Sequence, residues 1–140
     1  MELSANIIIG SAASLATSLI LRPLWSALAQ SLADTKQSSS LWQTSNARNE
    51  LCYLSAHALA GAAQGALFWL SWGFVALISA PWWYRGLAVG LGNALLLLLP
   101  LLLVSASVVR INKILWLVLS SEALAISLTV GLACSWHWAR

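Results

Sequence analysis

Four long apolar runs constrain what this chain can fold into more than any other feature of its sequence. A helix rises about 1.5 Å per residue, so about 20 apolar residues cross the roughly 30 Å hydrocarbon core of a bilayer. We therefore predict an all-α polytopic membrane protein, in which a four-transmembrane-helix bundle forms a single membrane domain over 1–140. The predicted spans are about 5–21, 53–80, 86–109 and 114–134.

The composition excludes a soluble globular domain. Of the 140 residues, 60% are hydrophobic and only 8% are charged. A soluble domain of this size buries only about two-thirds of the surface that its unfolded chain exposes, so it would leave large apolar patches in water. The seven Lys and Arg residues are scattered singly, which argues against a nucleic-acid partner despite the net charge of +3. The lipid bilayer is the partner that this composition predicts.

Prolines and polar residues mark the ends of the predicted spans. Arg22 and Pro23 close the first span, because proline lacks the amide that a continuing helix needs. The next ten residues, LWSALAQSLA, carry their apolar side chains on one helical face and predict a short interfacial helix. The polar residues 34–50 form the predicted loop. Pro100 lies inside the third span, where it predicts a kink.

Aromatic residues and cations predict an orientation in the membrane. Trp and Tyr are enriched where membrane helices meet the headgroups, and the side with more Lys and Arg is usually cytoplasmic. Five of the cations fall on one side of the predicted bundle and two on the other. We predict a multi-pass protein of a bacterial inner membrane with both termini outside the cytoplasm. Its predicted interfacial anchors follow the second and fourth spans and are Trp82, Trp83, Tyr84, Trp136 and Trp138.

Polar side chains inside the apolar runs are the candidate functional residues. Such groups are costly in lipid, so they pair with neighbouring helices or serve a function. Counting residues inward from the ends of each span places one polar group of each helix near the middle of the bilayer. The predicted intramembrane polar cluster consists of Glu122, Gln64, Asn93 and Ser14, with His57 nearer the cytoplasmic end of the second span.

Glu122 is the acid at the centre of this predicted cluster. No Lys or Arg lies inside a predicted span, so desolvation should keep the carboxyl protonated, donating a hydrogen bond to Gln64 or Asn93. His57 could relay protons toward it. The alternative is that these residues only hold the helices together, each contributing about 1 kcal/mol. The Cys and His spacing fits no metal site, and no cofactor is predicted.

Glycine pairs predict close helix packing. Gly61 and Gly65 form one GxxxG pattern, and Gly86 and Gly90 form another. Small residues four positions apart let two helix backbones approach closely. The pattern fits packing inside one bundle as well as contact with a second copy or another membrane protein.

The sequence contains no GxSxG, HExxH, P-loop or dinucleotide motif, so an enzyme is not predicted. The packing faces favour a small non-enzymatic accessory or interaction subunit that binds a membrane-protein partner or forms a homo-oligomer. Two alternatives stay open: an ion- or proton-coupled transporter that uses Glu122, and an immunity protein against a membrane-active toxin. In size and helix count the chain resembles the small multidrug resistance exporters, which use a membrane-embedded glutamate in an antiparallel dimer. The embedded glutamate here lies in the fourth predicted helix rather than the first, and the five-to-two cation bias argues against dual topology.

Overall fold

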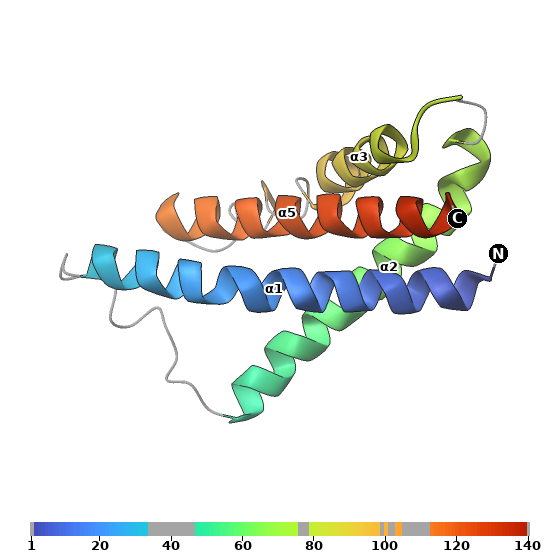
Figure 1. Cartoon of the computed structure of the whole chain (residues 1–140). Helices are drawn as coiled ribbons and strands as arrows, with labels where there is room; N and C mark the ends of the chain where they lie inside the picture. Colours follow the sequence, from blue (N-terminus) through green and yellow to red (C-terminus); the bar gives the residue numbers. More distant parts are fainter. Residues whose placement is uncertain are drawn as a thin grey trace.

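The computed structural model describes residues 2–33, 47–75, 79–98, 100, 103, 104 and 113–139. Every secondary-structure element in this part of the chain is helical, as the sequence predicts (Figure 1). In chain order the elements are α1 (Leu3–Ala33), α2 (Ala47–Val75), α3 (Trp82–Asn93), the π-helix η1 (Ala94–Leu98) and α5 (Lys113–Trp138). α1 and α5 lie side by side and run in opposite directions, α2 crosses them obliquely, and α3 packs on α5.

Three helices in the described part are long and apolar enough to cross a membrane: Leu3–Ala27 within α1, Glu50–Ser71 within α2 and Trp116–Trp138 within α5. The bundle exposes large apolar side chains and buries polar ones, which is the opposite of a soluble fold. Many Leu and Ile side chains on its outside are more than half exposed. The polar or charged residues buried in the described part are Asn6, Ser14, Ser18, Gln64, Glu122, Ser127 and Ser135. Lipid matches such an exterior, and polar groups inside must then satisfy one another.

α1 differs from the prediction because it continues through Pro23 to Ala33. The structure therefore has one continuous helix where the sequence predicted a span followed by a separate interfacial helix. Proline within a membrane helix removes one backbone hydrogen bond, and neighbouring groups often compensate for the loss. Here the acceptor that loses its amide donor is the Leu19 carbonyl, one turn before Pro23. Residues 24–33 contain neither a glycine nor a second proline, so no helix-ending residue follows Pro23 before Ala33.

α2 begins at Ala47, so the last four residues of the predicted loop are helical, while 34–46 lie outside the described residues. The predicted second span extends to residue 80, but α2 ends at Val75, and the described residues that precede Pro81 are not helical. Proline disfavours helical geometry at the residue before it. Pro81 itself is extended and stands directly before the first residue of α3.

The third predicted span is described only in its first half. α3 passes directly into the π-helix η1, and Pro100 follows shortly afterwards. A proline ring clashes with the carbonyl four residues earlier, here Leu96, which lies inside η1. The helix geometry is thus irregular next to the residue at which the sequence predicts a kink. Most of 99–112 lies outside the described residues.

α1 and α2 meet through small residues and make backbone contact. A Cβ added at Gly10 would fall on the Gly61 carbonyl oxygen, and one added at Gly65 would fall on the Asn6 carbonyl oxygen. Each step of four residues along α1 is matched by a step of four back along α2. The GxxxG face of α2 is therefore used inside the bundle. The buried residues that recur at every fourth position of α1 are Asn6, Gly10, Ser14 and Ser18.

α3 and α5 form a second antiparallel pair of the same kind. A Cβ at Gly86 would lie 2.8 Å from the Leu132 Cα, and one at Gly90 would lie 2.7 Å from the Ser127 carbonyl oxygen. The Ser135 hydroxyl donates to the Trp82 carbonyl at 2.6 Å, which fixes the register at one end. The second GxxxG pattern is also used inside the bundle.

The two ends of the bundle differ in chemistry. At one end, which we call the aromatic end, α1 and α3 begin and α5 ends, and both chain termini lie there (Figure 1). The Trp138 indole donates to the Asn6 side-chain oxygen at 3.0 Å and packs edge-on against Phe68. Trp138 is therefore part of the bundle interior rather than a purely interfacial residue. The other predicted anchors, Trp82, Trp83, Tyr84 and Trp136, are exposed at this end.

We expect Trp138→Phe to lower the free energy of unfolding in detergent by about 1 kcal/mol, because the buried Asn6 oxygen loses its donor. Trp83→Phe makes the same chemical change at a half-exposed ring and should have an effect near zero. Reversible denaturant titration of both variants measures the difference. Equal effects at the two positions would show that the Asn6 hydrogen bond contributes nothing to stability.

Candidate functional site

Glu122 lies on the face of α5 that turns toward α1 and α2. This face carries a buried residue at every fourth position, and the other members are Val118, Ile126, Val130 and Cys134. Helical spacing of four residues thus places one carboxyl in an otherwise apolar row. Glu122 is only 7% exposed, so water does not satisfy its carboxylate and protein groups must do so.

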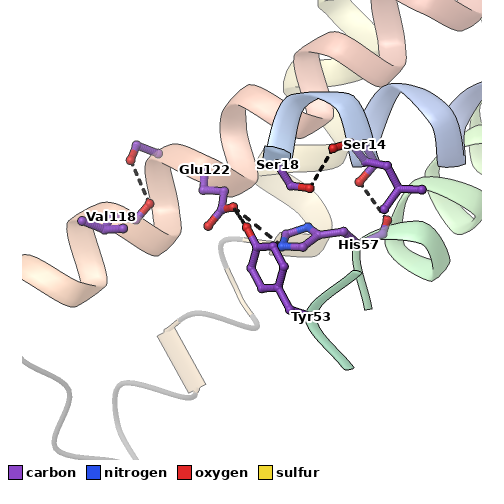
Figure 2. Close-up of polar contacts among 8 residues, drawn as sticks. Ser14, Ser18, Tyr53, His57, Val118 and Glu122 are labelled. Atoms are coloured by element: carbon purple, nitrogen blue, oxygen red, sulfur yellow. Dashed lines mark hydrogen bonds and ion pairs between the residues drawn. The ribbon is translucent and has the colours of Figure 1, made fainter. Parts of the chain in front are cut away.

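Tyr53 and His57, one turn apart on α2, are the partners of this carboxyl. The Tyr53 hydroxyl donates to Glu122 Oε1 at 2.6 Å, and His57 Nε2 lies 3.7 Å from the same oxygen (Figure 2). The two rings also contact each other edge to face, with their centroids 4.3 Å apart. The first distance is a short hydrogen bond, whereas the second permits an ion pair but is too long for a direct hydrogen bond.

α1 fixes the height of α2 at this site. The Ser14 hydroxyl donates to the His57 backbone carbonyl at 2.8 Å (Figure 2). The Ser11 hydroxyl donates to the Ala58 carbonyl at 3.1 Å. Both hydrogen bonds connect a side chain of α1 to the backbone of α2. The position of His57 beside Glu122 therefore depends on three helices rather than two.

An ion pair stands next to the site, at the end of the bundle opposite the aromatic end. The two terminal guanidinium nitrogens of Arg22 donate to the two carboxylate oxygens of Glu50, one bond to each oxygen. The Arg22 guanidinium carbon also lies 5.2 Å from the centre of the Tyr53 ring, a cation–π distance. We call this end of the molecule the ion-pair end. Arg22, Tyr53 and Glu122 form a continuous chain of contacts into the bundle.

The charges of these groups balance when the inner pair holds one proton. Arg22 and Glu50 cancel each other. Glu122 and His57 are together neutral with one proton, whether it resides on the carboxyl or on the imidazole. Charge is costly in a low-dielectric bundle, so this neutral arrangement is favoured over gaining or losing a proton.

The structure brings together only some of the predicted cluster. Glu122, His57 and Ser14 meet as described, but no hydrogen bond joins Glu122 to Gln64 or Asn93 within the described residues. Gln64 is buried two turns along α2 from His57, and its side-chain oxygen has no partner among the described groups. Asn93 ends α3, which packs on the face of α5 that carries Ser127 rather than Glu122.

Sequence reasoning missed Tyr53 and the Arg22–Glu50 pair. A signal for them exists in the spacing. Glu50, Tyr53 and His57 lie three and four residues apart on one face of α2, and Arg22 continues the four-residue series of α1 beyond Ser18. When α1 and α2 are aligned as an antiparallel pair, steps of four residues lead from the Gly10–Gly61 contact past Ser14 and Ser18 to the Arg22–Glu50 pair.

The described part of the chain defines a helical bundle with three helices long and apolar enough to cross a membrane, polar groups in its interior and one acid–imidazole pair. Within it, no group of three His, Cys, Asp or Glu residues lies close enough to hold a metal ion. No protein-family model, no curated protein and no solved structure matches the chain. Its function must therefore be argued from the site itself.

Proposed function

We propose that this protein binds and releases a proton at Glu122 inside the membrane, as a small proton-coupled transporter does. The observation that carries the proposal is the buried Glu122 carboxyl with a tyrosine hydroxyl at 2.6 Å and an imidazole at 3.7 Å. A titratable pair within lipid is a functional site by default, because an apolar pair of similar volume packs at lower cost. The pair also supplies the second titratable group that a proton relay needs.

The glycine contacts weigh against an interaction subunit as the first choice. That prediction was motivated by two close-packing faces that could receive a partner helix. Gly61 and Gly65 contact α1, and Gly86 and Gly90 contact α5. Both faces are filled by the chain's own helices, so the two GxxxG patterns do not require a helix from another protein.

The proposal includes four membrane crossings. α2 runs from the ion-pair end to the aromatic end, α3 starts at the aromatic end, and α5 starts at the opposite end (Figure 1). We propose that 82–112 makes the third crossing. The five-to-two cation bias then supports an orientation in which the aromatic end, with both termini, lies outside the cytoplasm of a bacterial inner membrane.

Cysteine labelling tests this orientation. Cys134 is buried and cannot serve as a reporter, so the background carries Cys52→Ser and Cys134→Ala. We expect Glu2→Cys to react with a membrane-impermeant maleimide added outside, and Lys36→Cys, in the predicted loop, to react only from the cytoplasmic side. Reaction of both positions from the same side would rule out an odd number of crossings between them, and with it the four-crossing arrangement.

Infrared difference spectroscopy tests proton binding directly. The protein in liposomes should show a buried carboxylic-acid band that changes across the pH range in which carboxyl and imidazole groups titrate. Glu122→Gln should abolish this band, and Glu50→Gln should leave it in place, because Glu50 is paired with Arg22. A spectrum with no pH-dependent band assignable to Glu122 would refute the proposed function.

A further inference from the structure

We infer that the Glu122 site exchanges its proton with one side of the membrane only, through the ion-pair end of the bundle. The inference rests on the proposed function and adds the direction of access to it. It follows from an asymmetry between the two paths that lead from Glu122 to the ends of the molecule.

Toward the ion-pair end, polar side chains become steadily more exposed. The exposed fraction of the side chain is 10% for Glu122, 18% for His57, 29% for Glu50 and 41% for Arg22. Tyr53 contacts Glu122, His57 and Arg22, and Arg22 pairs with Glu50, so these contacts connect Glu122 to the ion pair. The Tyr53 hydroxyl donates to Glu122, and the His57 imidazole, one turn further along α2, lies 3.7 Å from the same carboxylate oxygen. A proton arriving from water at this end meets hydrogen-bonding groups along the whole distance.

Toward the aromatic end, the same row of α5 is apolar. Ile126, Val130 and Cys134 follow Glu122 at successive turns, and each is at most 3% exposed. Phe68 of α2 packs among them at 1% exposure, and Trp138 covers the cluster. From Glu122 to Cys134 this plug spans 12 residues, or about 18 Å of helix. Closely packed apolar side chains oppose the entry of water along this row of α5.

The ionisable groups around Glu122 in the described residues come from α1 and α2. They are Arg22 of α1 and Glu50, Tyr53 and His57 of α2, while α3 packs on another face of α5. Gln64 and the Cys134 thiol lie on the plug side. Gln64 does not titrate, and the thiol contacts the Asn6 carbonyl rather than the acid. Water at the ion-pair end is therefore the donor and acceptor for the proton: hydronium gives a proton to the Glu122–His57 pair and leaves water, and the reverse returns it.

Carbodiimides test the direction of access, because they modify carboxylic acids covalently. Sealed vesicles of known orientation are treated with a membrane-permeable carbodiimide or with an impermeant quaternary-ammonium carbodiimide, and the mass of the peptide that contains Glu122 is measured. We expect the permeable reagent to modify Glu122 from either side. The impermeant reagent should act at least about tenfold faster from the ion-pair side, since the plug must open at a cost above about 1.4 kcal/mol to admit it from the other.

The outcomes separate the two proposals. Equal modification by the impermeant reagent from both sides, modification only from the aromatic side, or no modification by it at all would overturn one-sided access and leave proton binding standing. Failure of the permeable reagent, together with an absent infrared band, would remove the proposed function itself.

Two single-cysteine variants, each made in the Cys52→Ser, Cys134→Ala background, provide an independent measurement of access. His57→Cys should react with a small cationic thiol reagent from the ion-pair side, and Val130→Cys should react from neither side. Reaction of Val130→Cys from the aromatic side would show that the plug is open, whatever the carbodiimides report.

Discussion

Gly61→Leu is expected to prevent the native bundle from forming. A Cβ at this position would collide with the Gly10 carbonyl and would lie 2.5 Å from the Ser14 Cβ. The obstacle is mainly backbone, so no rotamer change can relieve it, and α1 and α2 must separate. Separation also breaks the Ser14–His57 hydrogen bond and the Arg22–Glu50 pair. We expect the free energy of unfolding to fall by more than about 3 kcal/mol, as measured by denaturant unfolding. The yield of folded monomer on size-exclusion chromatography should fall as well.

Gly92→Leu is the matched control for this substitution. A Cβ at Gly92 would meet nothing within 4 Å, and glycine inside a helix is itself unfavourable. The control should fold like the unmodified protein, with a stability change of less than about 0.5 kcal/mol. If Gly61→Leu were as stable as Gly92→Leu, the α1–α2 contact would not exist in the membrane.

The helices and their packing faces could be read from the sequence for a simple physical reason. Lipid requires long apolar helices, and close approach requires small residues at fixed intervals, so both constraints appear as local patterns. The helical class is confirmed, and three of the four predicted spans coincide with helices long and apolar enough to cross a membrane. The remaining prediction, over 86–109, is helical in its described residues, 86–98, 100, 103 and 104, and the other residues of this span lie outside the described part.

The partners of Glu122 could not be read in the same way, because depth alone does not fix which side chains meet. The predicted cluster assumed that Tyr53 and Lys113 begin their spans at one height. In the structure Tyr53 reaches Glu122, nine residues into α5, so the two helices are staggered and Gln64 lies too far along α2. Asn93 belongs to a helix on another face of α5. Stagger and rotation depend on pairwise packing, which a single apolar pattern does not encode.

The continuation of α1 through Pro23 has a similar origin. Local propensity predicts a helix end at proline, whereas Arg22 is held by Glu50 of the neighbouring helix. The ion pair and the cation–π contact anchor the turn in which the proline lies. A tertiary contact thus outweighs a local preference, and that contact joins residues 28 positions apart.

Glu122→Lys is expected to destroy the bundle. Glu122→Gln should keep the fold and lose only the proposed proton binding. A lysine ammonium would lie among Tyr53, His57 and Arg22, and the other carboxylate near the site in the described residues, Glu50, is already engaged by Arg22. An unpaired buried charge costs about 3 kcal/mol or more. Glutamine retains an oxygen that accepts from Tyr53 and has nearly the same volume, so its stability should stay within about 1 kcal/mol. Denaturant unfolding in detergent measures both variants. If Glu122→Lys were as stable as Glu122→Gln, the carboxyl would be facing water, and the Glu122–His57 pair could not be the basis of the proposed proton binding.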